Sequence, residues 1–262
     1  MGETAMIIDS HAHFSDKAVL IYDPSLKRVL DTMDRLGVDY MIQSLGRSLG
    51  PNDRPDFDGF VEECDEIFEK SGKRIYSYFV YNPFCADFCL KLIEENHNDP
   101  AFVGIKIHPA DNNCYADDER YRPIYELAKK YRLPILSHTW ALTSNPKQKF
   151  SVPERFERFI EEYPEVNFIF GHSGGRVEGI RKAVEIGTRY KNAYYDIAGD
   201  IYDRRLIEYI CSHVGADHLL FGSDVPWFDP ASQMGMVLGA NLTTEEKALV
   251  LGGNASKLFG IQ

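Results

Sequence analysis

The chain is poor in cysteine and carries none of the cysteine pairs that bind zinc. Its five cysteines form no C-x-x-C pair. An odd, sparse set of this kind argues against a disulfide framework and a zinc ribbon. The sequence also lacks an apolar run of the ~18–20 residues that span a bilayer. Residues 1–13 lack the zones of a signal peptide. We therefore expect a cytoplasmic protein with no membrane partner.

Positive charge is also scarce. The chain has 29 Lys and Arg residues against 40 Asp and Glu residues, a formal net charge of −11. Because nucleic-acid phosphates bind surfaces rich in Lys and Arg, this composition argues against a nucleic-acid partner. No low-complexity linker and no internal repeat divides the sequence. We therefore expect a single domain over residues 1–262 that binds a small-molecule substrate, with a homodimer as the one assembly to consider.

What the sequence does contain is a regular alternation of short apolar runs and longer segments with helical spacing. The apolar runs, which predict strands, are Met6–Ile8, Tyr40–Ser44, Ile75–Val80, Val103–Ile107, Pro134–Ser137, Val166–Phe170, Ala193–Ile197 and Leu219–Phe221. The segments that predict helices are Leu26–Leu36, Phe57–Lys70, Phe84–Glu95, Tyr121–Tyr131, Glu154–Tyr163, Val177–Tyr190, Arg204–Val214 and Thr244–Leu251.

This alternation predicts a parallel sheet, because every return to the sheet needs a helical crossover. The strand segments are apolar throughout, which is typical of strands buried on both faces. Eight such units in 262 residues match an α/β fold of the (β/α)8 TIM-barrel type. An open, doubly wound sheet is the main alternative.

Polar residues gather where the predicted strands end. The carboxyl ends of barrel strands meet at one face, and barrel active sites are built there. We therefore expect one group of six side chains to converge at that mouth. Its members are His11, His13, His108, His138, His172 and Asp224.

Four of these residues form a candidate metal site. His11 and His13 are two residues apart, so both point to the same side of a strand. His138 ends the fifth strand, and Asp224 follows the eighth, which adjoins the first in a closed barrel. Three imidazoles and one carboxylate suit Zn²⁺, with Mn²⁺, Fe²⁺ or Co²⁺ as alternatives. The sequence therefore predicts one divalent ion held by these four residues.

The same motifs resemble a known family. In order, IDSHAH, GIKIHP, LSHT, FGHSGG, FGSDVPW and GGNASKLFG are similar to motifs of the amidohydrolase superfamily. The resemblance is greatest to the amidohydrolase-related group that includes aminocarboxymuconate semialdehyde decarboxylase, and it extends from Ile7 to Gly260. It implies a (β/α)8 barrel with a catalytic divalent metal, whose ligands correspond to the four residues above.

The resemblance also implies catalytic roles. Asp224 and His172 would carry the acid–base work, and His172 could also be a ligand. Our main interpretation is a hydrolase that attacks an amide, a lactone or another C–N or C–O bond with a metal-activated water. The alternative is a non-oxidative decarboxylase of a small, possibly aromatic, carboxylate. Lys106 lies on the fourth strand, where some superfamily members bridge two metals through a carbamylated lysine. A single metal with Lys106 near the substrate is the expectation here.

Further residues near strand ends are candidates for binding substrate. Arg47 and Arg176 could each clamp a carboxylate with the planar guanidinium fork. Asp9, two residues before His11, should face the same way and could accept an imidazole N–H. The remaining candidates are Lys106 on the fourth predicted strand, Asp196 on the seventh, and three residues that follow strands, namely His108, Trp140 and Trp227.

A serine hydrolase is a rival interpretation. Gly171-His-Ser-Gly-Gly175 matches the nucleophile motif G-x-S-x-G between a predicted strand and a predicted helix. Ser173 would be the nucleophile, Asp196 the acid, and His213 or His218 the base. That interpretation leaves the histidines of the first strand unexplained. A barrel that binds metal without catalysis is a second rival, although nothing in the sequence closes the open ligand position that catalytic metal sites keep.

Overall fold

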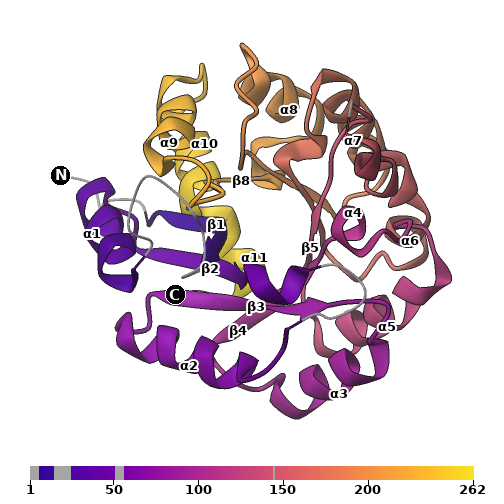
Figure 1. Cartoon of the computed structure of the whole chain (residues 1–262). Helices are drawn as coiled ribbons and strands as arrows, with labels where there is room; N and C mark the ends of the chain where they lie inside the picture. Colours follow the sequence, from indigo (N-terminus) through magenta and orange to yellow (C-terminus); the bar gives the residue numbers. More distant parts are fainter. Residues whose placement is uncertain (1–5, 15–24, 51–55, 144) are drawn as a thin grey trace.

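Eight parallel strands form one sheet in the order β1 to β8, with helices outside it (Figure 1). This arrangement is a (β/α)8 barrel, as the alternation predicted. The computed structural model describes residues 6–14, 25–50, 56–143 and 145–262. The strands are β1 (Ile8–Phe14), β2 (Tyr40–Leu45), β3 (Ile75–Tyr81), β4 (Phe102–Ile107), β5 (Ile135–His138), β6 (Phe168–Gly171), β7 (Ala193–Asp196) and β8 (Leu219–Leu220).

The helices lie between consecutive strands and after β8. They are α1 (Leu26–Leu36), α2 (Phe60–Lys70), α3 (Ala86–Asn96), α4 (Pro109–Asn112), α5 (Arg122–Tyr131), α6 (Glu157–Glu162), α7 (Val177–Arg189), α8 (Leu206–Val214), α9 (Pro230–Gly239), α10 (Thr244–Ala248) and α11 (Asn254–Phe259). Short 3₁₀ segments also lie near the mouth, among them η1 (Gly46–Leu49), η3 (Pro146–Phe150) and η5 (His172–Gly174).

Helix α9 is absent from the sequence-based expectation, although a start signal precedes it. The Asp229 carboxylate accepts a hydrogen bond from the Ala231 backbone N–H at 2.9 Å. Pro230 occupies the first helical position, where its missing N–H costs nothing. An aspartate cap followed by proline therefore marks the start of this helix, although the spacing of its apolar residues does not.

The barrel closes through the first strand and the residues around β8. The Ser10 backbone N–H donates to the Phe221 carbonyl at 2.9 Å, and the His13 N–H donates to the Val225 carbonyl at 2.6 Å. The Asp224 N–H donates to the His11 carbonyl at 2.7 Å. These backbone bonds form a closing seam that places Asp224 beside the histidines of β1.

The interior of the barrel differs from one end to the other. Its floor is apolar, with one buried side chain from each of six strands, namely Ile8, Ile42, Tyr78, Leu136, Ile169 and Leu220. Ala255 and Phe259 of α11 pack against this group from below, together with Ile261. A second apolar cluster fills the space between the sheet and the outer helices. The polar residues that follow the strands therefore stand on a packed apolar floor.

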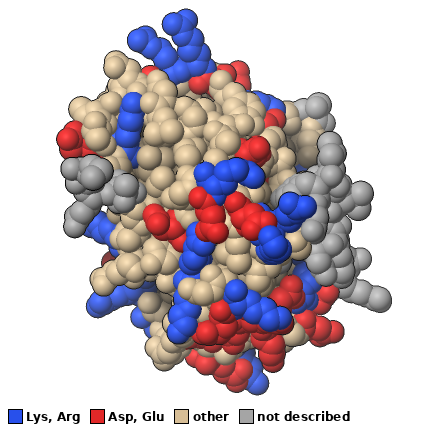
Figure 2. Space-filling view, turned by 90° about the vertical axis from the view of Figure 1, so that its left-hand side faces the viewer, with Lys and Arg blue, Asp and Glu red and all other residues tan. Residues whose placement is uncertain are grey.

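The outer surface carries both charges. On the face shown in Figure 2, basic and acidic side chains are intermingled. Across the part of the chain that the structure describes, many charged side chains form ion pairs, such as Arg122 with Glu162 at 2.6 Å. Within the described residues, no helix is both long enough and apolar enough to cross a membrane.

Candidate metal centre and active site

A cavity of about 490 Å³ lies at the carboxyl ends of the strands. It contains most of the residues that the sequence predicted for the site, as expected for a barrel. Its walls include His13, Arg47, Lys106, His108, His138, Trp140, His172, Asp224 and Trp227. His11 lies just beneath this surface and is fully buried.

His11, His13 and Asp224 bring ligand atoms within 4.8 Å of one another. His13 Nε2 lies 3.2 Å from Asp224 Oδ1, and His11 Nε2 lies 4.0 Å from the same oxygen. The closing seam explains this proximity, because it pairs β1 with the segment that contains Asp224. Three of the four predicted ligands thus form one cluster.

His138, the fourth predicted ligand, faces His172 across the cavity. Its Nδ1 lies 3.1 Å from His172 Nε2, and its Nε2 lies 3.1 Å from Gln148 Oε1. The ring stacks on His108 with centroids 4.3 Å apart and planes 6° from parallel. His172 itself adjoins His11, with ring centroids 4.9 Å apart. The five imidazoles therefore form a continuous group across the mouth.

Outer hydrogen-bond partners determine which nitrogen of each ring carries a lone pair. The Ala198 carbonyl can only accept, so His172 Nδ1–H donates to it at 2.9 Å. The Asp196 carboxylate accepts from His11 Nδ1 at 2.8 Å. With Gln148 Oε1 bonded to His138 Nε2, the nitrogens that face the cavity are His11 Nε2, His138 Nδ1 and His172 Nε2. Hydrogen-bond acceptors that do not themselves bind the metal commonly orient metal-binding histidines in this way.

The electrostatics of the cluster favour neutral rings and an ionised carboxylate. Burial lowers the pKa of His11, His13 and His138 below the ordinary histidine value. Burial alone would raise the pKa of Asp224, but the hydrogen bond from His13 holds that pKa below its usual range. Neutral imidazoles and a carboxylate anion are the protonation states that a metal requires.

Lys106 places a buried amine inside this group. Its Nζ donates to His11 Nε2 at 2.8 Å, and its side chain is 1% exposed. Burial lowers the pKa of Lys106 to about 8, so the amine is still mostly protonated at neutral pH. Lys106 therefore brings positive charge to the base of the cavity.

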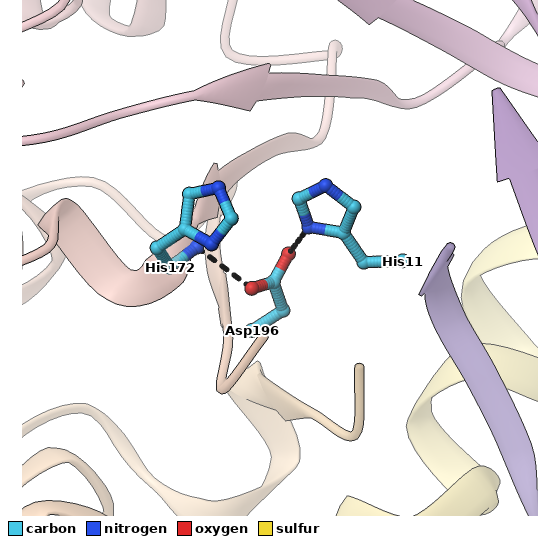
Figure 3. Close-up of side chains that lie close together, drawn as sticks. All are labelled: His11, His172 and Asp196. Carbon is cyan, nitrogen blue, oxygen red and sulfur yellow. Dashed lines mark hydrogen bonds and ion pairs between the residues drawn. The ribbon is translucent and has the colours of Figure 1, made fainter. Parts of the chain in front are cut away.

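Two buried aspartates near the cluster differ from expectation. Asp196 does not line the cavity, as a substrate-binding residue would; it is fully buried and contacts His11 (Figure 3). Asp9 does not reach an imidazole. Its carboxylate accepts from the Ser223 N–H at 2.9 Å and from the Ser223 hydroxyl at 2.5 Å. The register of β1 shifts between Asp9 and Ala12, and such a bulge breaks the alternation on which the expectation for Asp9 rested.

The two arginines already have anionic partners. Arg47 lines the cavity, but its guanidinium pairs with Asp56 at 2.9 Å and with Glu63. Arg176 pairs with Asp200 at 2.6 Å and lies over the ring of Trp140, 5.2 Å from its centroid. Neither guanidinium is presented to the cavity as a clamp without a partner.

The two tryptophans lie at the mouth as predicted. Trp140 continues the stack of His108 and His138, its plane 4° from that of His138. Gly175 packs against the face of Trp140, where a Cβ would come within 2.5 Å of the ring. Trp227 lines the cavity and is 54% exposed, so it borders the entrance.

The serine-hydrolase interpretation is wrong. Ser173 is fully buried, and its hydroxyl donates to the Asp196 backbone carbonyl at 2.6 Å. His213 Nδ1 lies against the Tyr209 carbonyl at 2.7 Å, and His218 Nε2 lies 3.1 Å from the Lys191 carbonyl. Both proposed bases therefore bond to backbone remote from the serine, whose role is to hold the turn after β6.

Gln148 is a site residue that the sequence did not suggest. It lies in η3, ten residues beyond His138, in a segment that folds back over the mouth. The Ser151 hydroxyl donates to Gln148 Oε1 at 3.1 Å, and the Trp140 N–H donates to the Ser151 carbonyl at 3.1 Å. No local pattern marks a glutamine for this position, because the contact depends on the path of the loop.

The fold and the side chains together define a parallel (β/α)8-barrel protein with a candidate metal centre at its carboxyl-end mouth. A family model described as Amidohydrolase matches residues 8–261, and the chain belongs to this family. None of the curated proteins matches the chain. The resemblance inferred from the motifs is confirmed.

Solved structures share the fold. 5-Carboxyvanillate decarboxylase LigW from Sphingomonas paucimobilis is 16% identical over 99% of this chain and 100% of its own, with a TM-score of 0.76. 2,6-Dihydroxybenzoate decarboxylase from Rhizobium is 17% identical over 98% and 99%, with a TM-score of 0.76. 5-Carboxyvanillate decarboxylase from Novosphingobium aromaticivorans, complexed with manganese and 4-hydroxy-3-methoxy-5-nitrobenzoic acid, is 16% identical over 98% and 96%, with a TM-score of 0.77.

Proposed function

We propose that this chain is a metal-dependent non-oxidative decarboxylase of a small aromatic carboxylate. The observation that carries the proposal is the cavity itself. It combines the cluster of His11, His13 and Asp224 with the amine of Lys106 and with the parallel rings that follow β4 and β5. The named activities of the barrels with the same fold support decarboxylation over the hydrolysis that the sequence first suggested.

The donor set fits one divalent cation. Imidazole nitrogens and a carboxylate suit Zn²⁺ and also Mn²⁺, and manganese is present in a protein of the same fold. His11, His13 and Asp224 would hold the ion, with His138 or His172 offering a further lone pair. When bound, such an ion supplies positive charge that stabilises oxyanions and acidifies water. The chain is proposed to act as one domain, because the ligands come from both of its ends.

The residues of the cavity can supply the remaining chemistry. The Lys106 ammonium can receive a carboxylate, and the indole rings of Trp140 and Trp227, which line the cavity, can contact an aromatic ring. In decarboxylation the C–C bond to the carboxylate breaks, CO₂ leaves, and the ring carbon takes up one proton. His172 Nε2 faces the cavity while Nδ1–H stays fixed on the Ala198 carbonyl. His172 can therefore carry that proton at Nε2.

The test is to incubate protein loaded with Zn²⁺ or Mn²⁺ with a panel of hydroxylated benzoates and to measure released CO₂. Esters, lactones and amides are assayed in parallel. We expect metal-dependent CO₂ release from at least one aromatic carboxylate. Hydrolysis without CO₂ release would favour the second candidate below. Purified protein that binds no divalent metal would contradict both.

Hydrolysis is the second candidate, and the position of Asp224 favours it. Its carboxylate lies at the cavity surface beside His13, 3.2 Å from Nε2, and can take a proton from an attacking water molecule. His172 could pass a proton to the leaving group. Both reactions would use the same residues, so only the product distinguishes them.

Lys106 offers a sharper test of the substrate class. Lys106→Met keeps the length of the side chain but removes a charged hydrogen bond, which contributes about 1.5–3 kcal/mol. We expect KM for a carboxylate substrate to rise by about 10–100-fold. A neutral ester or amide should be affected far less. Mass spectrometry of the intact protein should show an unmodified lysine, and a carbamate on Lys106 with two metals per chain would contradict this role.

A further inference from the structure

Asp196 is a fully buried carboxylate with three hydrogen-bond donors aimed at it. One oxygen accepts from His11 Nδ1 at 2.8 Å. The other accepts from the backbone N–H of His172 at 2.7 Å and from that of Ala198 at 3.0 Å. Figure 3 shows the carboxylate between the two histidines, reached from β7. It cannot meet substrate, because it is 0% exposed and does not line the cavity.

We propose that Asp196 is the positioning residue that presents His11 Nε2 to the metal and fixes the start of the turn after β6. This inference rests on the proposed metal centre but concerns a residue outside it. By accepting at Nδ1, the carboxylate keeps the ring proton on the far side of His11 from the cavity. Nε2 is thereby left with its lone pair toward His13 and Asp224.

The backbone N–H groups of His172 and Ala198 determine which way an asparagine at position 196 would be oriented. They occupy one carboxylate oxygen, so in Asp196→Asn the amide oxygen would stay with them and the NH₂ group would face His11 Nδ1. An NH₂ group donates, so Nδ1 would have to accept and the ring proton would move to Nε2. A protonated Nε2 cannot bind a metal. The same logic explains why replacing an aspartate behind a catalytic histidine by asparagine selects the wrong tautomer.

Asp196 also holds His172, but through the backbone. His172 and Ser173 both adopt left-handed backbone conformations, with φ of 59° and 50°. Non-glycine residues rarely adopt this conformation, so surrounding contacts must maintain it. The Asp196 side chain accepts from the His172 N–H, and the Asp196 carbonyl accepts from the Ser173 hydroxyl. One residue therefore sets the positions of imidazoles from two different strands.

Asp9 provides a matched control inside the same molecule. It is also a fully buried carboxylate, and it lies two residues before His11. Its donors are the Ser223 N–H and hydroxyl and the His11 backbone N–H at 3.3 Å, with no imidazole among them. Asp9→Asn therefore replaces a buried carboxyl group near the site without reversing a ring tautomer.

The first experiment uses metal-free protein, so it does not depend on the proposed activity. Nitrogen-15 NMR of the histidine rings reports the tautomer of His11. We expect the Nδ1–H form in the wild type and in Asp9→Asn, and the Nε2–H form in Asp196→Asn. Because Lys106 also donates to His11 Nε2, each variant is repeated with Lys106→Met. An Nε2–H ring in the wild type, or an unchanged ring in both Asp196→Asn backgrounds, would overturn the proposal.

The second experiment titrates each folded variant with Zn²⁺ and Mn²⁺. We expect Asp196→Asn to weaken binding by about 10–100-fold, the range seen for partners of metal ligands. Asp9→Asn should change affinity by less than about threefold at equal fold integrity. An equal loss in both variants would overturn the tautomer argument. If the wild type binds no metal but the His11 tautomer still reverses in Asp196→Asn, Asp196 does set the His11 tautomer and the proposed metal centre is wrong.

Amide hydrogen exchange tests the link to His172. Asp196→Asn keeps an acceptor for the His172 N–H, whereas Asp196→Ala removes it. The His172 amide should therefore stay protected in the Asn variant and exchange faster in the Ala variant. Equal protection in the two variants would contradict the backbone part of the proposal.

Discussion

The two ends of the barrel interior are stabilised in different ways. At the floor, six strands contribute apolar side chains that pack on α11. At the mouth, β1, β5 and β6 supply or lead into imidazoles, β4 and β7 supply Lys106 and Asp196, and Asp224 follows β8. Each of these polar groups would cost free energy if it were buried without partners. The floor is held by close packing, and the mouth is held by directed hydrogen bonds. Substitutions at the floor should therefore change stability, and substitutions at the mouth should change binding.

Removing the histidines of β1 should have the largest effect. In His11→Ala/His13→Ala two of the clustered ligands are lost, and metal affinity should fall by more than the about 100-fold seen for outer partners. Elemental analysis and turnover would measure this loss. The control is His97→Ala/His213→Ala, which removes a half-buried and an exposed histidine that both lie away from the mouth. Stoichiometric metal in the β1 double variant would contradict the assignment of the site.

The floor should respond in the opposite way. Phe259 of α11 packs edge-on against Tyr78, with ring centroids 5.8 Å apart. Phe259→Ala should lower the free energy of unfolding by about 3–5 kcal/mol, because it leaves a cavity under the barrel. Urea unfolding measures the change. Phe88→Ala, which removes a 51% exposed ring, should cost less than about 1 kcal/mol. If folded Phe259→Ala bound less metal per molecule than the wild type, the claim that the floor affects stability and not binding would be contradicted.

Substitutions of Gln148 test the mouth without replacing a predicted metal ligand. Gln148→Met removes the acceptor for His138 Nε2, so we expect metal affinity to fall by about 10-fold. Gln148→Glu keeps the acceptor and should retain wild-type affinity or exceed it. Calorimetric titration of metal would measure both. Lys149→Met, an exposed change in the same 3₁₀ segment, is the control, and an equal loss there would assign the effect to the loop as a whole.

The outer surface should respond least. The hydrogen bond from Arg120 lowers the pKa of Asp118 to about 2. A depressed carboxyl pKa stabilises the fold above its ordinary value of 3.8, and this contribution disappears as the pH falls toward about 2. Because the pair is largely exposed, Asp118→Asn should lower the free energy of unfolding by less than about 1 kcal/mol at about pH 6 and by still less at about pH 3. A larger cost in urea unfolding would show that the surface contributes more than expected.

The mouth also marks the limit of prediction from sequence. Strand spacing was sufficient to predict the barrel and to bring His11, His13 and Asp224 together, because barrel geometry relates strand ends to one another. Asp9 was misplaced, since a bulge in β1 cannot be seen in the alternation of residue types. Gln148 was missed because its contact depends on how a loop folds. Within the sequence, nothing distinguishes an arginine free to bind substrate from one paired with a carboxylate, as Arg47 is.

During synthesis the first strand is complete long before the segment that lies beside it in the barrel. Its neighbour on one side, β2, follows within a few tens of residues, but its other neighbour consists of residues 219–225. A chain that stops before Asp224 contains every histidine of the mouth and still lacks both that carboxylate and two of the three backbone bonds of the seam. If the proposed metal centre forms, binding of the ion by the full ligand set would therefore follow synthesis of nearly the whole chain. Once bound, the ion would tie the first strand to the last and add about 2.7 kcal/mol to stability at a hundredfold excess over its Kd.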